Sequence, residues 1–455
     1  MDRKMSGTGE RALVIGLGKS GIAVCEVLRE RNWEVLATDE FPDRASAALA
    51  HVASLGVTFV PIEKLQQSLR GGELAVLSPG VPPSARPVAI AWAMGCTVIG
   101  EAELAWRFAR APFLAVTGTK GKSTTSALLA HLLRAAGKKT ALGGNIGDPL
   151  IREVLPDGLE AIVAELSSFQ LESIDRLHAR VAVLLNISPD HLDRYGSMDE
   201  YASAKFRIVE NSVAGDTLVA NRDDERVWCF ARSSAATISV IDYSLVDPSA
   251  RIAVIGDRIV DTRASVELAA VADVPLIGRH NLANAMAALG AALAFGVDPT
   301  HFPAALRSFT GMSHRLQHVA EIGGVRYVDD SKATNPEAAI AALESFAQPV
   351  VAIVGGRAKG TAFDALGDAL ARHARAVLAI GEAAAEIDGA LAGRVPSERP
   401  ATMAQAVQRA SELARAGDVV LLSPACASFD MFRSAEHRGE EFIAAVHVLE
   451  GGARA

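Results

Sequence analysis

The most informative stretch of the sequence is a glycine-rich segment, GTKGKSTT, at residues 118–125. It follows the apolar run Phe113–Val116, which we predict to be a strand, and it precedes the helical pattern Ser123–Ala136. Such a loop points backbone N–H groups at phosphate oxygens, and the following helix adds the positive end of its dipole. Lys122 would contact the β- and γ-phosphates of a nucleotide, and Ser123 would hold Mg²⁺.

The spacing of this loop differs from the full P-loop pattern. That pattern has a glycine five residues before the Gly-Lys glycine, and Val116 occupies this position here. Gly118 lies three residues before Gly121 instead. A glycine-rich turn without a ligand is the alternative, and the Gly-Lys-Ser-Thr run where a strand meets a helix favours phosphate binding.

Carboxylates and a histidine follow two further predicted strands. Glu165 comes directly after Ala161–Ala164, and the segment Asp190–Asp193 follows Val181–Asn186. Ligands of an open parallel sheet bind beyond the C-terminal ends of its strands, so these groups are expected at the same edge as the phosphate loop. Oxygen ligands suit Mg²⁺, which also keeps waters and phosphate oxygens. A single histidine is usually structural, and His191 is interpreted as functional only because of its neighbours.

A second glycine-rich turn lies near the N-terminus. VIGLGKSG, residues 14–21, spaces three glycines as GxGxxG between the predicted strand Leu13–Ile15 and the predicted helix Ser20–Glu30. Asp39 follows the next predicted strand, and Ser78–Gly80 ends another. This pattern is typical of binding to NAD or another phosphorylated nucleotide. A tight turn without a ligand is the alternative.

The composition is that of an ordinary globular enzyme. The chain has 455 residues, of which 50% are hydrophobic and 22% charged, and its formal net charge is −8. Because a protein domain typically has about 150 residues, a chain of this length is expected to contain roughly three domains. The mild negative charge argues against nucleic-acid binding, and the chain lacks the run of about 18 apolar residues that a membrane span needs. Four scattered cysteines without a CxxC pair suit a reducing cytoplasm.

Short apolar runs alternate with helical patterns along nearly the whole chain, which is typical of parallel α/β domains. We predict three α/β units, at residues 1–100, 101–311 and 312–455. Around residues 237–260 the pattern changes to short β-like pieces. The predicted strands of the last unit are Val325–Val328, Val350–Val354, Val377–Ile380 and Val419–Leu422.

The chain also carries a series of motifs that can be interpreted together. In order, they are GTKGKST, ELSSFQLE, NISPDHLDRY, GRHNLANA, MSHRLQ, DDSKATNP, GGRAKG and SPACASFDMF. Together they resemble the Mur ligase family of bacterial cell-wall synthesis, over nearly the whole chain. ELSSFQLE and SPACAS are similar to the members that add D-glutamate to UDP-N-acetylmuramoyl-L-alanine, whereas GKST is shared with all Mur ligases and with folylpolyglutamate synthases.

The resemblance implies a fold and a reaction. It implies a Rossmann-like N-terminal domain that binds the UDP substrate, a central P-loop ATPase domain and a Rossmann-like C-terminal domain that binds glutamate. The expected protein is a cytoplasmic, monomeric ligase that uses ATP and two Mg²⁺ ions and activates a carboxylate as an acyl phosphate. Lys205 matches a lysine that carries a carbamate in this family. The resemblance also changes the expected ligand of the N-terminal glycines from NAD to a UDP-sugar.

The resemblance assigns roles to individual positions. The expected ATP-phosphate residues are Gly118, Thr119, Lys120, Gly121, Lys122, Ser123 and Thr124. The other expected nucleotide residues are Asn281, Asn284, Arg315 and Asp330. The expected UDP-substrate residues are Ser20, Asp39, Ser78, Pro79, Gly80 and Asn145, and the expected glutamate residues are Thr334, Lys359 and Ser428. The expected metal ligands are Ser123, Glu165, His191 and carbamylated Lys205, and the expected catalytic set is Lys122, His191 and Lys205.

Two positions depart from the family pattern. Ala358 replaces the acidic residue that commonly precedes the family's lysine, and Ala435 stands where an aromatic residue often lies. These departures leave L-glutamate or another amino acid as alternative substrates. A folylpolyglutamate synthase-like ligase is a further alternative, although that family lacks the N-terminal GxGxxG block. An NAD-dependent dehydrogenase would leave the phosphate loop, Glu165 and His191 unexplained, and a non-catalytic nucleotide sensor would not need the metal ligands.

Overall fold

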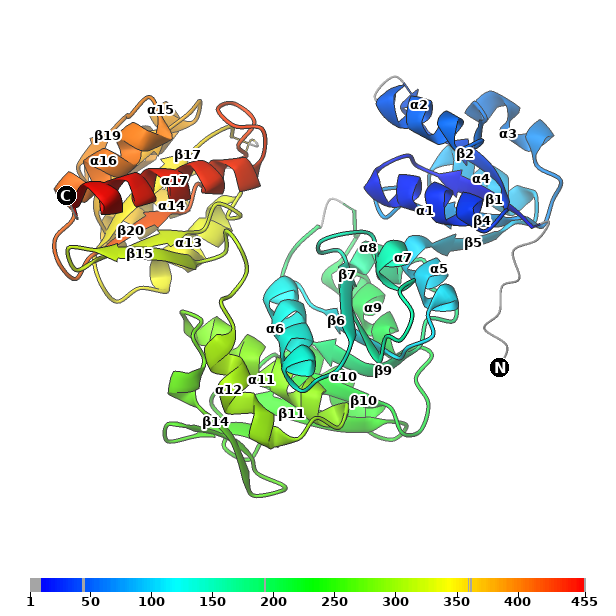
Figure 1. The fold of residues 1–455 in the computed structure, drawn as a ribbon, viewed down its shortest axis with the longest axis horizontal. Helices are drawn as coiled ribbons and strands as arrows, with labels where there is room; N and C mark the ends of the chain where they lie inside the picture. The colour runs from blue at the N-terminus through cyan, green and yellow to red at the C-terminus, as the bar shows by residue number, and fades with distance from the viewer. Residues whose placement is uncertain (1–9, 43–45, 192–193, 359, 361, 454–455) are drawn as a thin grey trace. The chain divides into compact units, whose positions relative to one another are not determined.

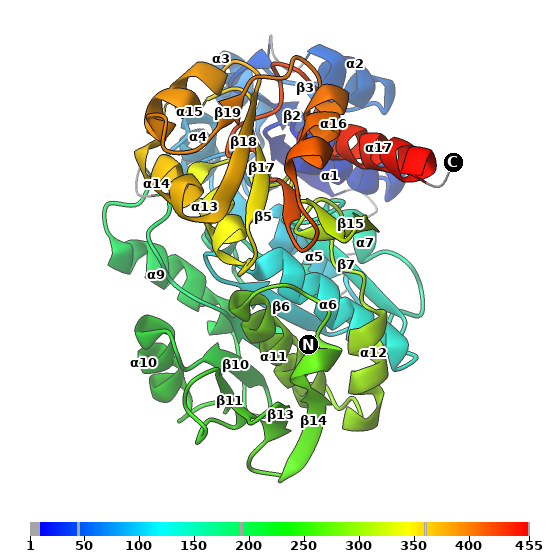
Figure 2. The ribbon, with the colours of Figure 1, turned by 90° about the vertical axis from the view of Figure 1, so that its left-hand side faces the viewer.

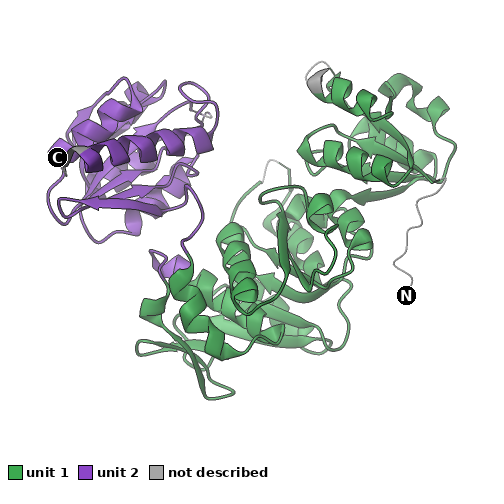
Figure 3. Cartoon of the chain, viewed as in Figure 1, with its two compact units in different colours: residues 1–274, 283–309 green, residues 275–282, 310–455 purple. Residues whose placement is uncertain are grey.

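In the computed structural model, the described residues form three β-sheets, each flanked by helices (Figure 1). The chain divides into two compact units (Figure 3). One comprises residues 1–274 with 283–309 and holds the first two sheets, and the other comprises residues 275–282 with 310–455 and holds the third. The structure describes residues 10–42, 46–191, 194–358, 360 and 362–453.

The first sheet has five parallel strands in the order β3-β2-β1-β4-β5. Successive strand residues face opposite sides of a sheet, so Val14 packs in one apolar core and Leu13 in another. From β1 the chain continues to β2 on one side, and from β4 it continues to β5 on the other side. The strand order therefore reverses between β1 and β4, and such a switch point is where open α/β sheets bind ligands. The elements are β1 (Arg11–Ile15), α1 (Lys19–Glu30), β2 (Glu34–Thr38), α2 (Ser46–Ser54), β3 (Thr58–Phe59), α3 (Ile62–Ser68), β4 (Leu74–Leu77), α4 (Arg86–Ala93) and β5 (Thr97–Gly100).

The second sheet has nine strands in the order β14-β13-β12-β11-β10-β9-β6-β8-β7. Strands β6 to β12 pair in parallel, whereas β12, β13 and β14 form an antiparallel meander. Helix α6 packs on β6, β7 and β8, and α10 packs on β10 (Figure 2). The strands are β6 (Phe113–Thr117), β7 (Thr140–Gly144), β8 (Ala161–Glu165), β9 (Ala179–Leu184), β10 (Thr217–Asn221), β11 (Ser239–Ser244), β12 (Ile252–Ile255), β13 (Arg258–Asp261) and β14 (Val266–Ala270). The helices are α5 (Glu101–Phe108), α6 (Lys122–Ala135), α7 (Leu150–Glu153), α8 (Ser168–Leu171), α9 (Met198–Phe206), α10 (Glu225–Ser234), α11 (Arg279–Ala294) and α12 (Phe302–Ser308).

The third sheet has six strands in the order β15-β16-β20-β17-β18-β19. Among the described strands of this sheet, only β15 runs antiparallel to its neighbour, so the loops after β16, β20 and β17 emerge side by side at one edge. The strands are β15 (Gln317–Ile322), β16 (Val325–Asp329), β17 (Val350–Gly355), β18 (Ala374–Ile380), β19 (Ser397–Glu398) and β20 (Val419–Leu422). The helices are α13 (Pro336–Glu344), α14 (Asp364–His373), α15 (Ala384–Leu391), α16 (Met403–Leu413) and α17 (Ala435–Ala453).

The predicted elements around the glycine loops are present with small shifts of their ends. The predicted strand Val181–Asn186 lies at Ala179–Leu184 instead. The helix predicted at Asp199–Asn211 ends at Phe206, and a single 3₁₀ turn continues to Val209. No helix in the described part of the chain is both long enough and apolar enough to span a bilayer.

Candidate active site

The phosphate loop joins β6 to α6 and depends on two glycines with positive φ. Gly118 has φ 153° and Gly121 has φ 84°, in the region where a side chain would be strained. A Cβ atom at Gly121 would also lie 2.3 Å from Oδ1 of Asn284 on α11. The glycine therefore allows Asn284, a predicted nucleotide residue, to pack against the loop.

Asn186 holds the phosphate loop in place from the next strand of the sheet. Its carbonyl oxygen accepts a hydrogen bond from the backbone N–H of Thr119 at 2.9 Å. Its side-chain amide accepts from the N–H of Lys120 at 2.8 Å and donates to the Lys120 carbonyl at 3.0 Å. In addition, the N–H of Ser188 donates to Oγ1 of Thr119 at 3.1 Å. No role was assigned from the sequence to Asn186, which is the last residue of the predicted strand Val181–Asn186 and lies just beyond β9.

Two lysines approach the same carbonyl oxygen of this loop. Nζ of Lys122 donates to the carbonyls of Gly118 and Thr119 at 2.9 and 2.8 Å, and Nζ of Lys205 donates to the Gly118 carbonyl at 2.8 Å. Lys205 is 2% exposed, and its Nζ lies 4.7 Å from the centre of the Tyr201 ring. Burial, followed by the nearby charge of Lys122, lowers the pKa of Lys205 to about 7.

Glu165 is the last residue of β8 and is 1% exposed. Its Oε1 accepts a hydrogen bond from Nδ2 of Asn145 at 2.8 Å. Its Oε2 is buried and has no hydrogen-bond partner among the described residues. Because buried carboxylate oxygens are normally paired, this oxygen fits a cation ligand. The described residues contain no cluster of three His, Cys, Asp or Glu side chains, so a metal here must also use hydroxyl, phosphate or water oxygens.

His191 lies in the left-handed region, with φ 53°, directly after Asp190. Its side chain is about half exposed, and its ring centre lies 4.8 Å from that of Phe169 on α8. Nε2 of His191 is 3.7 Å from Oδ2 of Asp190. Asp193 lies outside the described residues. The histidine is therefore held by Phe169 of the ELSSFQLE segment, the segment that also contains Glu165.

A cavity of about 530 Å³ lies at the switch point of the first sheet. Its walls come from the loops after β1, β2, β4 and β7 together with α8. Asp39 shapes one wall, because its two oxygens accept hydrogen bonds from the N–H groups of Leu17 and Phe41 at 2.7 and 2.8 Å. All of the residues predicted to bind the UDP substrate line this cavity, namely Ser20, Asp39, Ser78, Pro79, Gly80 and Asn145.

Asn145 connects this cavity to Glu165. It lines the cavity, and its side chain and its backbone N–H donate to the carboxylate and to the carbonyl of Glu165, at 2.8 and 2.9 Å. Since Glu165 ends the strand β8 that pairs with β6, the cavity lies beside the strand end that carries the phosphate loop. The arrangement can therefore bring a bound acid close to a nucleotide phosphate.

The third sheet positions the remaining predicted residues. Asp330 follows β16 and accepts hydrogen bonds from the N–H of Leu316 at 3.2 Å and from Oγ of Ser423 at 3.0 Å. Burial raises the pKa of Asp330 to about 7, against the opposing charge of Arg315. Thr334 is half-buried in the loop after β16, and buried Ser428 lies in the loop after the neighbouring strand β20. The predicted residue Lys359 lies outside the described residues.

Arg438 on α17 ties these loops together and was not anticipated from the sequence. It is fully buried, and its guanidinium donates to Oγ and O of Ser331 at 3.0 and 2.9 Å and to the carbonyl of Cys426 at 3.1 Å. A Cβ atom at Gly356, after β17, would lie 3.2 Å from its Nη1. Burial lowers the pKa of Arg438 to about 10. One side chain thus reaches the loops after three adjacent strands.

Family models match most of the chain. The Mur ligase MurD-like N-terminal domain matches residues 10–100, the Mur ligase middle domain residues 116–292, and the Mur ligase glutamate ligase domain residues 314–426. The chain belongs to the Mur ligase family. The resemblance stated from the motifs is therefore confirmed, together with the three-domain α/β fold.

Curated relatives match this Mur ligase over nearly its full length. The UDP-N-acetylmuramoylalanine–D-glutamate ligase of Pelotomaculum thermopropionicum is 42% identical and covers 98% of this chain and 99% of its own. The protein of the same name from Geotalea daltonii is 39% identical, with 98% of each chain covered.

Solved Mur ligases share the fold of this chain. UDP-N-acetylmuramate-alanine ligase MurC from Thermotoga maritima superposes with a TM-score of 0.62, at 18% identity, over 96% of this chain and 99% of its own. MurF from Acinetobacter baumannii gives a TM-score of 0.61, also at 18% identity, over 98% of this chain and 93% of its own.

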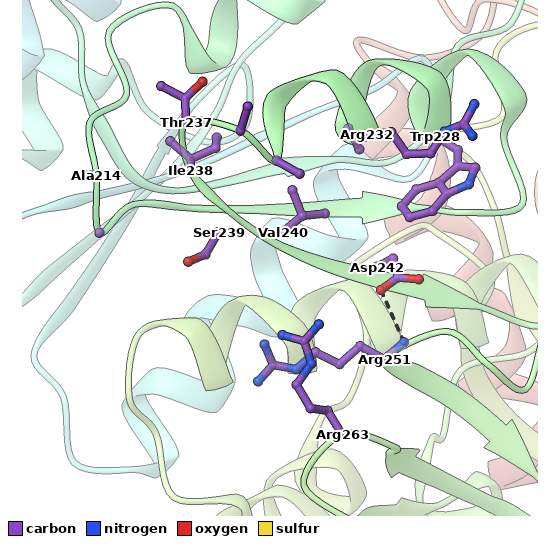
Figure 4. Close-up of a pocket in the computed structure, with 14 residues that line it drawn as sticks. Ala214, Trp228, Arg232, Thr237, Ile238, Ser239, Val240, Asp242, Arg251 and Arg263 are labelled. Carbon is purple, nitrogen blue, oxygen red and sulfur yellow. Dashed lines mark hydrogen bonds between the residues drawn. The ribbon is translucent and has the colours of Figure 1, made fainter.

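A second hollow in this Mur ligase, of about 590 Å³, contains none of the predicted site residues. It lies between α10 and β11, and it is also lined by Arg251, which precedes β12, and by Arg263, which follows β13. In Figure 4 the guanidinium groups of Arg251 and Arg263 lie side by side, with Trp228 on the opposite wall. This hollow shares no lining residue with the cavity at the first sheet, so the two are separate.

Proposed function

We propose that this Mur ligase joins D-glutamate to UDP-N-acetylmuramoyl-L-alanine in peptidoglycan synthesis and converts ATP to ADP and phosphate. Its relatives at 42% and 39% identity carry the name of this reaction. The observation that carries the proposal is the cavity at the first sheet. The predicted UDP-substrate residues all line it, and one of them, Asn145, also donates to Glu165.

We assign one role to each part of the chain. Residues 1–100 bind the UDP moiety, residues 101–311 bind ATP, and residues 312–455 bind glutamate. The phosphate loop supports the second role, because Lys122 and the backbone N–H groups at the start of α6 lie where a nucleotide phosphate would bind. Asn281, Asn284, Arg315 and Asp330 are assigned to the rest of the nucleotide. A cytoplasmic location and a monomeric state stay predictions from the sequence.

The donor set suits magnesium. Ser123 is the second residue of α6, and Glu165 has one buried oxygen without a hydrogen-bond partner among the described residues. We assign these two residues to one Mg²⁺, and His191 with carbamylated Lys205 to a second. Bound Mg²⁺ would supply positive charge that stabilises phosphate oxygens as the reaction proceeds.

The environment of Lys205 favours a carbamate. Carbamate formation needs a neutral amine, whose nitrogen bonds to the carbon of CO₂ while a proton leaves to solvent. Burial lowers the pKa of this lysine to about 7, so a large fraction is neutral near physiological pH. The product is an anion, which a cation would attract, whereas an ammonium group beside a cation would be repelled.

The reaction needs positioning more than it needs a protein nucleophile. A carboxylate oxygen of the bound substrate attacks the γ-phosphorus, and the bond to the β-phosphate oxygen breaks to release ADP. The amine of glutamate then attacks the acyl carbon, loses a proton, and phosphate leaves. Lys122 offsets the charge that develops on the phosphates, and Asn145 holds the muramoyl-peptide part of the substrate in the cavity.

The amino acid is assigned to the loops after β16, β20 and β17. Thr334 and Ser428 are hydroxyl donors after two neighbouring strands, and Lys359 provides a cation after the third. Two hydroxyls and a cation suit a ligand with two carboxylates. Ala358 and Ala435 leave the preference for D- over L-glutamate to experiment.

The decisive experiment measures phosphate release from ATP with UDP-N-acetylmuramoyl-L-alanine and, in turn, D-glutamate, L-glutamate, L-lysine and meso-diaminopimelate. We expect release only with D-glutamate and a product of matching mass. Release confined to a diamino acid would refute the amino-acid assignment and leave the ligase activity standing. No release with any amino acid, together with oxidation of NADH, would refute the ligase activity itself. Lys122→Ala serves as the inactive control.

A further inference from the structure

Lys19 bridges two walls of the UDP-substrate cavity. It is the first residue of α1, after the N-terminal glycine loop. Its Nζ donates to the carbonyl of Gly147 at 2.8 Å and lies 3.0 Å from Oδ1 of Asp148, both in the loop after β7. The side chains of Lys19 and Asp148 are 65% and 61% exposed, so water has access to the pair. Lys19 therefore spans the mouth of the cavity from one loop to another.

Lys19 is also the only positively charged residue that lines this cavity, in which every lining residue belongs to the described part of the chain. Two acidic residues, Asp39 and Glu40, share the lining, and Asp148 adds a third acid at the rim. Asp39 is engaged by the N–H groups of Leu17 and Phe41. The resting cavity is thus acidic, which disfavours an anionic ligand unless a cation turns toward it.

We propose that Lys19 is a diphosphate-binding residue and that Asp148 competes with the substrate for it. This inference rests on the proposed function, because a UDP-sugar brings two negative phosphates into the cavity. When the substrate binds, Nζ of Lys19 exchanges Asp148 and the Gly147 carbonyl for phosphate oxygens. An exposed ion pair is weak and easily exchanged, so the lysine is available without a large conformational cost. Asp148 then sets how tightly the substrate is bound.

Two substitutions of this pair have opposite expected effects. Lys19→Met should raise KM for the UDP substrate about 10-fold or more, the size expected for a lost charge-assisted contact, with kcat and KM for ATP far less affected. Asp148→Asn should lower KM for the UDP substrate about 2- to 5-fold, because an exposed competitor of Lys19 is removed. Lys64→Met removes an exposed lysine from α3 of the same sheet and is the matched control, with no expected change.

The double variant separates competition from a general loop effect. In Lys19→Met/Asp148→Asn, the gain from Asp148→Asn should disappear, because the competitor acts only through Lys19. Equal increases in KM for the UDP substrate in the two single variants would overturn the inference. If the ion pair only joined two loops, removal of either partner would raise this KM. The inference would also be overturned if Asp148→Asn still lowered the KM for the UDP substrate in a protein that lacks Lys19.

Direct binding keeps this test independent of the ligase reaction. Calorimetric titration of the full chain with UDP and with uridine isolates the contribution of the diphosphate. We expect Lys19→Met to weaken UDP binding about 10-fold and to leave uridine binding unchanged. Equal losses for UDP and uridine would refute a contact with the diphosphate. A Lys19-dependent UDP affinity without glutamate-dependent phosphate release would instead refute the proposed function and leave this inference standing.

Discussion

The pH dependence of Lys205 tests the proposed carbamate directly. Burial and the charge of Lys122 lower the pKa of Lys205 to about 7, from an ordinary value of 10.5. The neutral amine should therefore be about 10% of the lysine at pH 6 and about 90% at pH 8. Because only the neutral amine combines with CO₂, the carbamate should increase as the pH rises through 7. A lysine with an ordinary pKa would be almost entirely protonated across this range.

The measurement is the ¹³C NMR signal of the protein in ¹³C-labelled bicarbonate, recorded from pH 6 to pH 8. We expect a carbamate resonance that grows with pH and is missing in Lys205→Ala. In the assay of phosphate release, Lys205→Ala should lose most activity and regain part of it with formate or acetate, whose carboxylate would replace the carbamate. A fully active Lys205→Ala variant, or a resonance that it retains, would refute the reasoning.

The burial of Lys205 also predicts how the free energy of unfolding depends on pH. The unfolded lysine keeps its proton up to pH 10.5, whereas the folded lysine loses it near pH 7. The cost of burying the ammonium group is therefore complete below pH 7 and declines as the pH rises toward 10.5. In buffer without CO₂, Lys205→Met should stabilise the protein by about 3–5 kcal/mol at pH 6 and by clearly less at pH 9. A pH-independent difference in urea unfolding would contradict this expectation.

Four further substitutions probe separate parts of the molecule. Lys122→Ala should abolish phosphate release and preserve UDP binding, and near-normal turnover would remove the phosphate-loop assignment. Asp39→Ala should weaken UDP binding and spare ATP affinity, whereas tight binding of NAD to the unaltered protein would show that the UDP assignment is wrong. Lys359→Ala should lower glutamate affinity about 10- to 150-fold, with ATP affinity little changed. Arg438→Met should lower the free energy of unfolding by about 1–3 kcal/mol, as judged by urea denaturation, and Arg438→Lys should restore part of it.

The parts of the site that lie close together in sequence could be predicted well. Strand, glycine loop and helix are contiguous around Gly118–Thr124, so local spacing alone predicted the turn, which the structure contains. Glu165 was placed at a strand end, and it is the last residue of β8. The cavity residues required one step more, because Asp39, Ser78 and Asn145 come from different loops. The resemblance to the Mur ligase family assigned them to one substrate, and the structure places all three along one cavity.

Residues that hold the site together from a distance could not be predicted in this way. Asn186 contacts Lys120 across 66 positions of sequence, and Arg438 contacts Ser331 across 107. Asn186 opens the motif NISPDHLDRY but had no role assigned there, and Arg438 lies in none of the quoted motifs. Both side chains donate to backbone carbonyl groups, which every residue carries, so these contacts place no demand on the sequence of the partner. Of the antiparallel meander, β12 and most of β13 lie within residues 237–260, which were predicted only as short β-like pieces, and β14 was not predicted. Strands of four or five residues are too short to show a clear alternation of apolar and polar residues.

Asn145 explains how two binding sites can act on one reaction. A freely moving substrate carboxylate would reach the γ-phosphorus only rarely. The substrate and the phosphate loop must therefore be held in a fixed position relative to each other. Strands β7, β8 and β6 are neighbours, and the loops after them carry Asn145, the residues that follow Glu165, and the phosphate loop. The side chain and backbone of Asn145 are both bonded to Glu165, while the residue also lines the substrate cavity. A displacement of Asn145 must therefore alter both the cavity wall and the orientation of the Glu165 carboxylate. In the proposed reaction, this would couple the position of the substrate to the phosphate that it attacks.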